Sequence, residues 1–119
     1  MLSKEQILAV DDIKSEIVHV PEWGGDVLVR GLTGTERDEF EESLAKGKKV
    51  SIRNIRAKLV ALGTIDEKFA RMFSEGDVAA LGAKSAAALD RVFNAIRRLS
   101  GLTSEDVAEL EKNSGPTPA

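Results

Sequence analysis

Two short β-branched runs around a Pro/Gly-rich turn place the strongest constraint on how this chain folds. Residues 16–20 and 27–30 alternate in the manner of strands, and the turn between them contains Trp23, the only tryptophan. The pattern predicts a β-hairpin. Because a two-stranded hairpin is marginally stable alone in water, it must pack on helices or gain a third strand. Residues 64–66 and 71–72 are candidates for such an additional extended segment.

Capping signals mark where helices begin. Hydroxyl side chains stand three positions before an acidic or amide side chain at Ser3, Thr33, Ser74 and Thr103, and a looser signal lies at Ser51. Together with hydrophobic periodicity, these signals predict helices near 3–10, 33–46, 51–62, 74–81, 83–100 and 103–112. A glycine follows several of these stretches, where we expect the positive φ of a helix C-terminus: Gly47, Gly63, Gly82 and Gly101.

The expected fold class is α+β, mainly α. It consists of an N-terminal β-hairpin at 16–30 packed on a small bundle of about four to six helices within 33–112. Residues 1–112 form a single globular domain in this prediction, followed by a flexible C-terminal tail at 113–119. Two helical stripes identify the helices expected at the centre of the core: Ile52, Ile55, Leu59 and Leu62 in one, and Leu89, Val92, Phe93, Ile96 and Leu99 in the other.

Composition argues for a soluble protein without a catalytic centre. Charged residues make up 31% of the 119 residues, cysteine is absent and His19 is the only histidine. A Cys/His nucleophilic dyad or a thiolate metal site therefore cannot be assembled, and adjacent acids such as Asp11 and Asp12 are typical solubilising charges. We expect no catalytic residue, no metal and no cofactor. Because the sequence shows no apolar signal segment and no membrane-spanning run, the predicted location is the cytoplasm.

Large apolar side chains near turns are candidates for contact with a partner protein. A tryptophan at a protruding turn is a typical binding hot spot. The partner-binding candidates are Trp23, Phe40, Phe69, Met72 and Phe73. The structural alternative is that Trp23 folds over the hairpin and that residues 69–73 form a satellite cluster. On the residues alone this alternative is favoured, because large apolar surface is costly to leave in water.

A second candidate surface is basic. Every ionisable residue from 46 to 62 is a lysine or arginine, whereas acids dominate before residue 46. A small nucleic-acid-binding regulator would use the possible basic patch Lys46, Lys48, Lys49, Arg53 and Arg56. The net charge of −3 argues against nucleic acid as the main partner. Such a cluster is more commonly a solvated helix entry that pairs with nearby acids.

Four segments of the chain resemble a known family. They are V-P-E-W-G-G-x-V-x-V-R-x-L-T-x-x-E-R-D-x-F at 20–40, N-I-R-A-K-L-V-A-L at 54–62, L-G-A-K-S-A-A-A-L-D-R-V-F at 81–93 and L-S-G-L-T-S-E-D-V at 99–107. In the identity and spacing of these residues the chain is similar to the tail assembly chaperones of bacteriophages with long, non-contractile tails. Residues 63–73 depart most from the family.

The resemblance implies a non-catalytic chaperone that binds the tape measure protein, keeps it soluble and promotes polymerisation of the tail tube protein around it. It also implies action in the bacterial host cytoplasm, absence from the mature virion and, in many such phages, a longer frameshift-extended form with the same N-terminal domain. A homo-oligomer is compatible with this function. Two other functions remain open: a structural tail or connector component of the virion, and the nucleic-acid-binding regulator described above.

Overall fold

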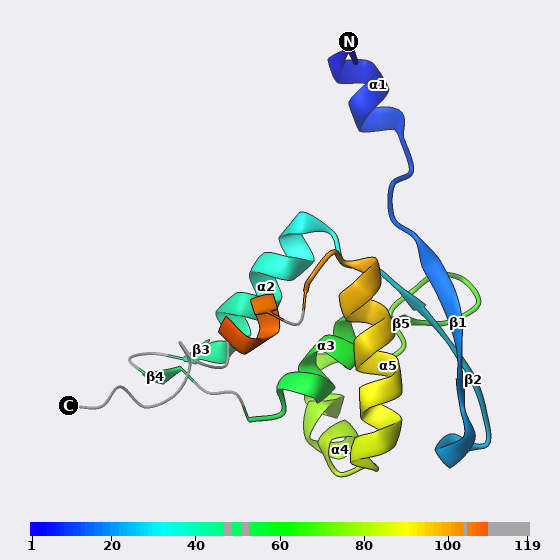
Figure 1. Cartoon of the computed structure of the whole chain (residues 1–119), viewed down its shortest axis with the longest axis vertical. Helices are drawn as coiled ribbons and strands as arrows, with labels where there is room; N and C mark the ends of the chain where they lie inside the picture. Colours follow the sequence, from blue (N-terminus) through cyan, green and yellow to red (C-terminus); the bar gives the residue numbers. More distant parts are fainter. Residues whose placement is uncertain (47–48, 51–52, 104, 110–119) are drawn as a thin grey trace.

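The computed structural model describes residues 1–46, 49–50, 53–103 and 105–109, and it confirms the α+β, mainly α class (Figure 1). The elements follow one another as α1 (Lys4–Ala9), β1 (Ser15–Val20), the 3-10 turn η1 (Pro21–Trp23), β2 (Gly25–Arg30), α2 (Gly34–Leu44), β3 (Ala45–Lys46), β4 (Lys49–Val50), α3 (Ile55–Gly63), β5 (Thr64–Ile65), η2 (Glu75–Asp77), α4 (Val78–Gly82) and α5 (Ala86–Leu99). Residues 105–109 are helical as well.

The predicted hairpin forms and gains a third strand. β1 and β2 pair antiparallel with Val20 opposite Gly25, and the turn closes because Gly24, at φ +73°, donates its N–H to the Pro21 carbonyl at 3.0 Å. β5 then pairs antiparallel with β2, placing Ile65 opposite Leu28. A bridge between Ile65 and Arg71 extends this edge, which confirms that both expected extended segments contribute. The hairpin is therefore part of a small three-stranded sheet.

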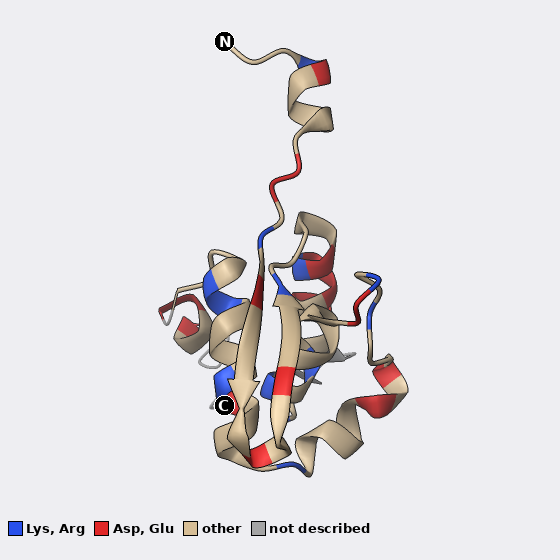
Figure 2. Ribbon diagram, turned by 90° about the vertical axis from the view of Figure 1, so that its right-hand side faces the viewer, with Lys and Arg blue, Asp and Glu red and all other residues tan. Residues whose placement is uncertain are grey.

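Helices α3 and α5 form the centre of the core, as the two stripes predicted. Leu59 of α3 and Ile96 of α5 are fully buried, and α5 also packs on the sheet, whose inner face contributes Val20 and Val29. Figure 2 looks onto the opposite, outer face of this sheet, with the helices behind it. Leu62 and Leu99 lie at the border of the core and are only partly buried. Ile52, the remaining stripe residue, lies outside the described residues.

Several predicted helix boundaries need correction. α2 ends at Leu44, and residues 45–46 pair with 49–50 as the short strands β3 and β4 instead of extending the helix. α3 begins only at Ile55, while the expected cap at Ser51 lies outside the described residues. α5 begins at Ala86 because Ser85 caps it, with its Oγ accepting the Ala88 N–H at 3.3 Å. These differences follow from local capping and from strand pairing that periodicity does not report.

The predicted role of the helix-ending glycines is correct at only one described position. Gly101 has φ +73°, but Gly63 and Gly82 are not in the positive-φ region. Gly63 is required for another reason, because a Cβ there would lie 2.6 Å from Cγ2 of Ile96. A Cβ at Gly82 would collide with the Asn54 side chain. At both sites the absence of a side chain permits close packing. Gly47 lies outside the described residues.

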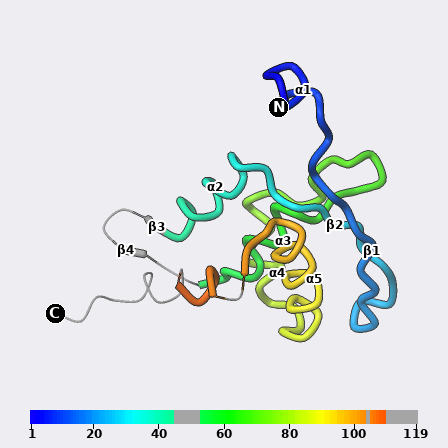
Figure 3. The backbone as a smooth tube through the Cα atoms, turned by 45° about the horizontal axis from the view of Figure 1, so that its top comes forward, coloured from blue at the N-terminus to red at the C-terminus, as the bar shows by residue number. Residues whose placement is uncertain are grey.

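The first helix stands apart from the rest of the molecule. α1 forms with its expected capping box, in which Ser3 Oγ accepts the Gln6 N–H at 3.1 Å and Gln6 Oε1 accepts the Ser3 N–H at 2.8 Å. Lys4–Ala9 are all described, and none of them is buried. Figures 1 and 3 both show α1 well separated from the other helices, joined to β1 by an extended segment. The predicted tail at 113–119 lies outside the described residues.

Candidate functional site

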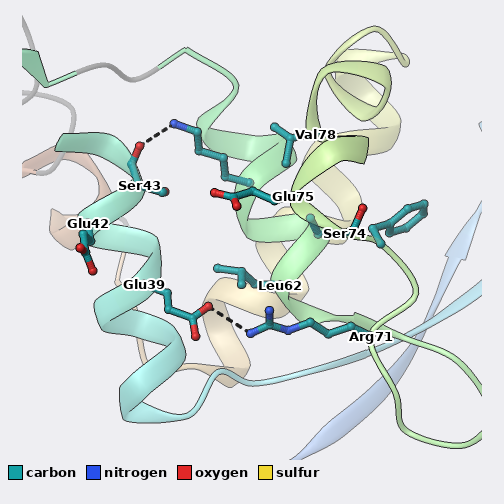
Figure 4. Close-up of a pocket in the computed structure, with 11 residues that line it drawn as sticks. Glu39, Glu42, Ser43, Leu62, Arg71, Ser74, Glu75 and Val78 are labelled. Carbon is teal, nitrogen blue, oxygen red and sulfur yellow. Dashed lines mark hydrogen bonds and ion pairs between the residues drawn. The ribbon is translucent and has the colours of Figure 1, made fainter. Parts of the chain in front are cut away.

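A groove lies between α2 on one side and α3 with the 71–78 segment on the other (Figure 4). Its volume is about 590 Å³. We call it the α2 groove and define it by its lining residues: Glu39, Glu42, Ser43, Lys58, Ala61, Leu62, Arg71, Phe73, Ser74, Glu75 and Val78.

The orientation of α2 is set at its first turn. The Thr33 N–H donates to Glu36 Oε1 at 2.9 Å and the Glu36 N–H donates to Thr33 Oγ1 at 3.1 Å, which confirms the predicted capping box. Further along, Phe40 and Leu44 are buried in the core at 0% and 2% exposure. Because these two side chains fix one face of α2 against the core, Glu39, Glu42 and Ser43 are left on the groove side.

Two basic side chains cross the groove near its two ends. Lys58 of α3 donates its Nζ to the Ser43 carbonyl at 2.9 Å. Arg71 donates Nη2 to Glu36 Oε2 at 2.9 Å and lies 3.3 Å from Glu39 Oε2. Figure 4 shows the contacts of Lys58 with Ser43 and of Arg71 with Glu39 as dashed lines. The cations therefore hold the walls together.

The floor of the groove is apolar and its edge is acidic. Ala61 is buried, while Leu62, Phe73 and Val78 are partly buried against the core and keep a share of their surface open to the hollow. Exposed carboxylates of Glu39, Glu42 and Glu75 stand at the edge. An apolar strip between acids offers both area for burial and charge for recognition.

Glu36 forms ion pairs with Arg30 and Arg71 next to the groove, and these groups stay charged at neutral pH. Burial by itself raises the pKa of Glu36, but hydrogen bonds from Arg30, the Thr33 N–H and Arg71 outweigh it and lower the pKa to about 2. The same hydrogen bond from Arg71 to Glu36 raises the arginine's pKa further above its ordinary value. A general acid or base works best when its pKa lies near the working pH. These two groups are instead suited to fixed electrostatic and structural roles.

The five partner-binding candidates end up in different places. Phe73 lines the α2 groove, whereas Phe69 and Met72 are exposed at 62% and 49%. Trp23 is partly buried and packs against the core, next to an ion pair in which Glu22 binds Arg91 of α5 at 2.9 Å. Phe40 is fully buried. The prediction that Phe40 contacts a partner at the surface is therefore wrong, because its side chain packs in the core and holds α2 against it.

Among the residues of the predicted basic patch, the structure describes the side chains of Arg53 and Arg56. Arg56 binds Asp90 with its Nε 2.6 Å from Oδ1, and its guanidinium lies 5.9 Å from the ring centre of Phe93. It therefore couples α3 to α5. Lys46 and Lys49 belong to β3 and β4, Arg53 precedes α3, and Lys48 lies outside the described residues.

Sequence reasoning did not identify most of the groove. Glu39, Glu42 and Ser43 follow the i, i+3, i+4 spacing of one helix face, beside the apolar pair Phe40 and Leu44. That spacing was the available signal on α2. Glu75 and Val78 come from a distant segment, and their approach to α2 depends on the path of residues 64–74.

Comparison with protein-family models, with curated proteins and with solved structures gave no match in any of the three. The resemblance to tail assembly chaperones therefore stays a prediction. Within the described residues there is no group of three or more His, Cys, Asp or Glu side chains placed to hold a metal ion. No helix in the same part of the chain combines the length and apolar character needed to cross a bilayer.

Proposed function

We propose that this protein is a non-catalytic assembly chaperone that binds a helical segment of a client protein in the α2 groove. The observation that carries the proposal is the apolar strip of Leu62, Phe73 and Val78 beneath exposed carboxylates. An amphipathic helix can bury its apolar face on such a strip. A client helix with basic residues beside its apolar stripe fits best, because Glu39, Glu42 and Glu75 border the groove.

The resemblance of residues 20–40, 54–62, 81–93 and 99–107 to tail assembly chaperones supports the tape measure protein of a long-tailed phage as this client. Binding would keep apolar helical segments of the tape measure protein out of water until tail tube protein polymerises around it. In this proposal the chaperone acts in the bacterial cytoplasm and leaves before the virion is complete. A frameshift-extended form would present the same groove.

The groove favours a polypeptide over nucleic acid. Its three carboxylates outnumber its two cations, Lys58 and Arg71, so the groove is net acidic and disfavours phosphate. Arg56 is already engaged by Asp90 and Phe93. For a regulator that uses the basic patch, affinity would fall steeply with salt and would depend on Lys48 and Arg53. For the chaperone, neutralising those two residues leaves client binding unchanged.

Co-expression with a candidate tape measure protein tests the proposal. We expect the client to become soluble and to co-purify. The double variant Glu42→Lys with Glu75→Lys, and separately Val78→Asp, should reduce recovery of the client about tenfold or more. The matched control is Asp38→Lys with Glu105→Lys, which makes the same charge change at exposed positions away from the groove. A client that stays insoluble and unbound with the wild-type chain overturns the proposal.

Purified virions separate the chaperone from a structural tail or connector component. Mass spectrometry of washed particles should detect tail tube and tape measure proteins without this chain. Its recovery at a fixed ratio to the tail tube protein would show a virion component instead.

A further inference from the structure

The exposed large hydrophobic side chains of the described chain fall into two groups. Those on the first ten residues, which we call the arm, are Met1, Leu2, Ile7, Leu8 and Val10. The others, Ile17, Phe69 and Met72, lie on the outer side of the sheet and on the loop that borders it. Contiguous exposed apolar surface on a water-facing protein is typical of an interaction site. We therefore expect each group to pack against a partner surface.

The outer face of the sheet forms a shallow apolar hollow. Strand register places Ile17, Leu28 and Ile65 in one row across β1, β2 and β5. Within this row Ile17 is exposed at 68%, whereas Ile65 is already buried at 1%. Together with Met72 they line a depression of about 680 Å³ whose edge carries Asp26, Asp66, Glu67 and Lys68. The same face of β1 and β2 also carries His19 opposite Asp26, whose side chains lie 2.7 Å apart. We call this surface the outer face.

The arm is built as a helix that lacks a packing partner within the described structure. Its capping box is complete, and Leu2 and Ile7 flank it at the positions of a hydrophobic staple. Yet a six-residue helix gains too little from local interactions to be stable alone in water, and all of α1 is exposed. A sequence that specifies such a helix with Ile7 and Leu8 exposed is consistent with docking on another surface.

We infer that the arm of one copy of this chain docks on the outer face of a second copy. Both surfaces belong to the same chain, so exchange between two copies covers both on each of them. A stable interface covers about 800 Å² per partner, roughly a tenth of the 8130 Å² of this chain. Eight large exposed apolar side chains, gathered in these two places, supply the apolar centre of such an interface.

The direction of the arm favours a second copy over its own sheet. The extended segment between Ala9 and Ser15 continues β1 beyond the end of the sheet, so α1 projects away from the outer face of its own chain (Figures 1 and 2). On a neighbour, Lys4 can approach the carboxylates of Asp66 and Glu67 at the edge of the hollow, while Ile7 and Leu8 cover its apolar row.

Sedimentation equilibrium of the full chain, from micromolar to millimolar concentration, tests this inference without any client. We expect concentration-dependent self-association. Leu8→Glu on the arm and Ile17→Glu on the outer face should each raise the dissociation constant about tenfold or more, with Met72→Glu as a second outer-face variant. The control Gln6→Glu adds the same charge to the arm and keeps its capping box. Unchanged far-UV circular dichroism shows that each variant is folded.

Mixing variants identifies which surfaces meet. Leu8→Glu retains an intact outer face and Ile17→Glu retains an intact arm, so their mixture should form a heterodimer more tightly than either variant associates alone. A chain that stays monomeric at millimolar concentration, or association that neither variant weakens, overturns the inference. So does a monomer in which spin labels place the arm on its own sheet. The proposed client binding uses the α2 groove and is tested separately.

Discussion

Arg30 and Glu36 meet in a two-pronged ion pair, with Nη1–Oε1 and Nη2–Oε2 distances of 2.6 Å each. Arg30 ends β2 and Glu36 lies in the first turn of α2, so the pair fixes the angle at which the acidic helix leaves the sheet. Arg71 binds the same carboxylate from the far wall of the α2 groove. Glu36 therefore links the sheet, α2 and the groove. In this chain the role of Arg30 and Glu36 is therefore structural.

Acid should weaken the fold through Glu36. Its pKa is about 2 when folded, below its ordinary value of 4.5, so its contribution is fully present above pH 4.5 and is lost as the pH falls toward 2. The shift corresponds to at most about 3 kcal/mol of the free energy of unfolding. Urea unfolding between pH 6 and pH 2, compared between wild type and Glu36→Gln, should show a larger acid-induced loss in the wild type. Equal losses in both proteins would refute this role.

Removing the charge of Glu36 should also destabilise the protein at neutral pH. Glu36→Gln leaves Arg30 and Arg71 without their shared carboxylate in a site where the Glu36 side chain is only 10% exposed. We expect a loss of about 2–4 kcal/mol in the free energy of unfolding. Glu41→Gln is the matched control, because it breaks an exposed pair with Arg37 within the same helix and should cost less than about 0.5 kcal/mol.

Close packing of α3 on α5 should make Gly63 intolerant of a side chain. In Gly63→Ala the new Cβ would lie 2.6 Å from Cγ2 of the fully buried Ile96, so the Ile96 side chain or one of the two helices must shift. We expect a loss of about 1–3 kcal/mol. Gly34→Ala makes the same change at the first residue of α2, where nothing lies within 4 Å, and should be neutral or slightly stabilising. Thermal unfolding of the two variants measures the difference, and equal stability would exclude the proposed clash.

The Gly63 site shows where sequence signals stop being sufficient. A glycine after an apolar helical run is typical of a helix C-terminus with positive φ, and Gly101 follows that rule. Gly63 has the same local signature but is small because α5 passes against it. Local sequence signals therefore predicted closely where α3 ends. They gave the wrong reason for the glycine, because Gly63 does not have positive φ. The reason depends on Ile96, which is far away in the sequence.

The candidate site was less predictable than the fold for the same reason. Capping at Thr33 and strand alternation at 16–20 and 27–30 are local, and each produced the expected element. The α2 groove instead depends on Arg71 meeting Glu36, 35 residues earlier, and on Lys58 reaching Ser43. Phe40 was misassigned because an aromatic residue on a very acidic helix does not show which way it turns.

Thr64 offers a position where a conservative change should stabilise the protein. It is 1% exposed in β5, and its Oγ1 finds no hydrogen-bond partner in the part of the chain that the structure describes. A buried hydroxyl without a partner costs free energy, because it has lost its hydrogen bonds to water. Thr64→Val replaces the hydroxyl with a methyl group and suits a strand. We expect a gain of about 1 kcal/mol in the free energy of unfolding, measured by urea denaturation.

The same threonine-to-valine substitution at Thr33 should lower the free energy of unfolding instead of raising it. Thr33 Oγ1 accepts the Glu36 N–H at 3.1 Å, so Thr33→Val removes the N-terminal cap of α2 and leaves that donor unpaired. A loss of about 1 kcal/mol follows, although both variants exchange a hydroxyl for a methyl group. The paired experiment separates the effect of hydrogen bonding from the general effect of threonine-to-valine exchange. A loss at Thr64 as large as that at Thr33 would show that the Thr64 hydroxyl is satisfied, for example by a buried water.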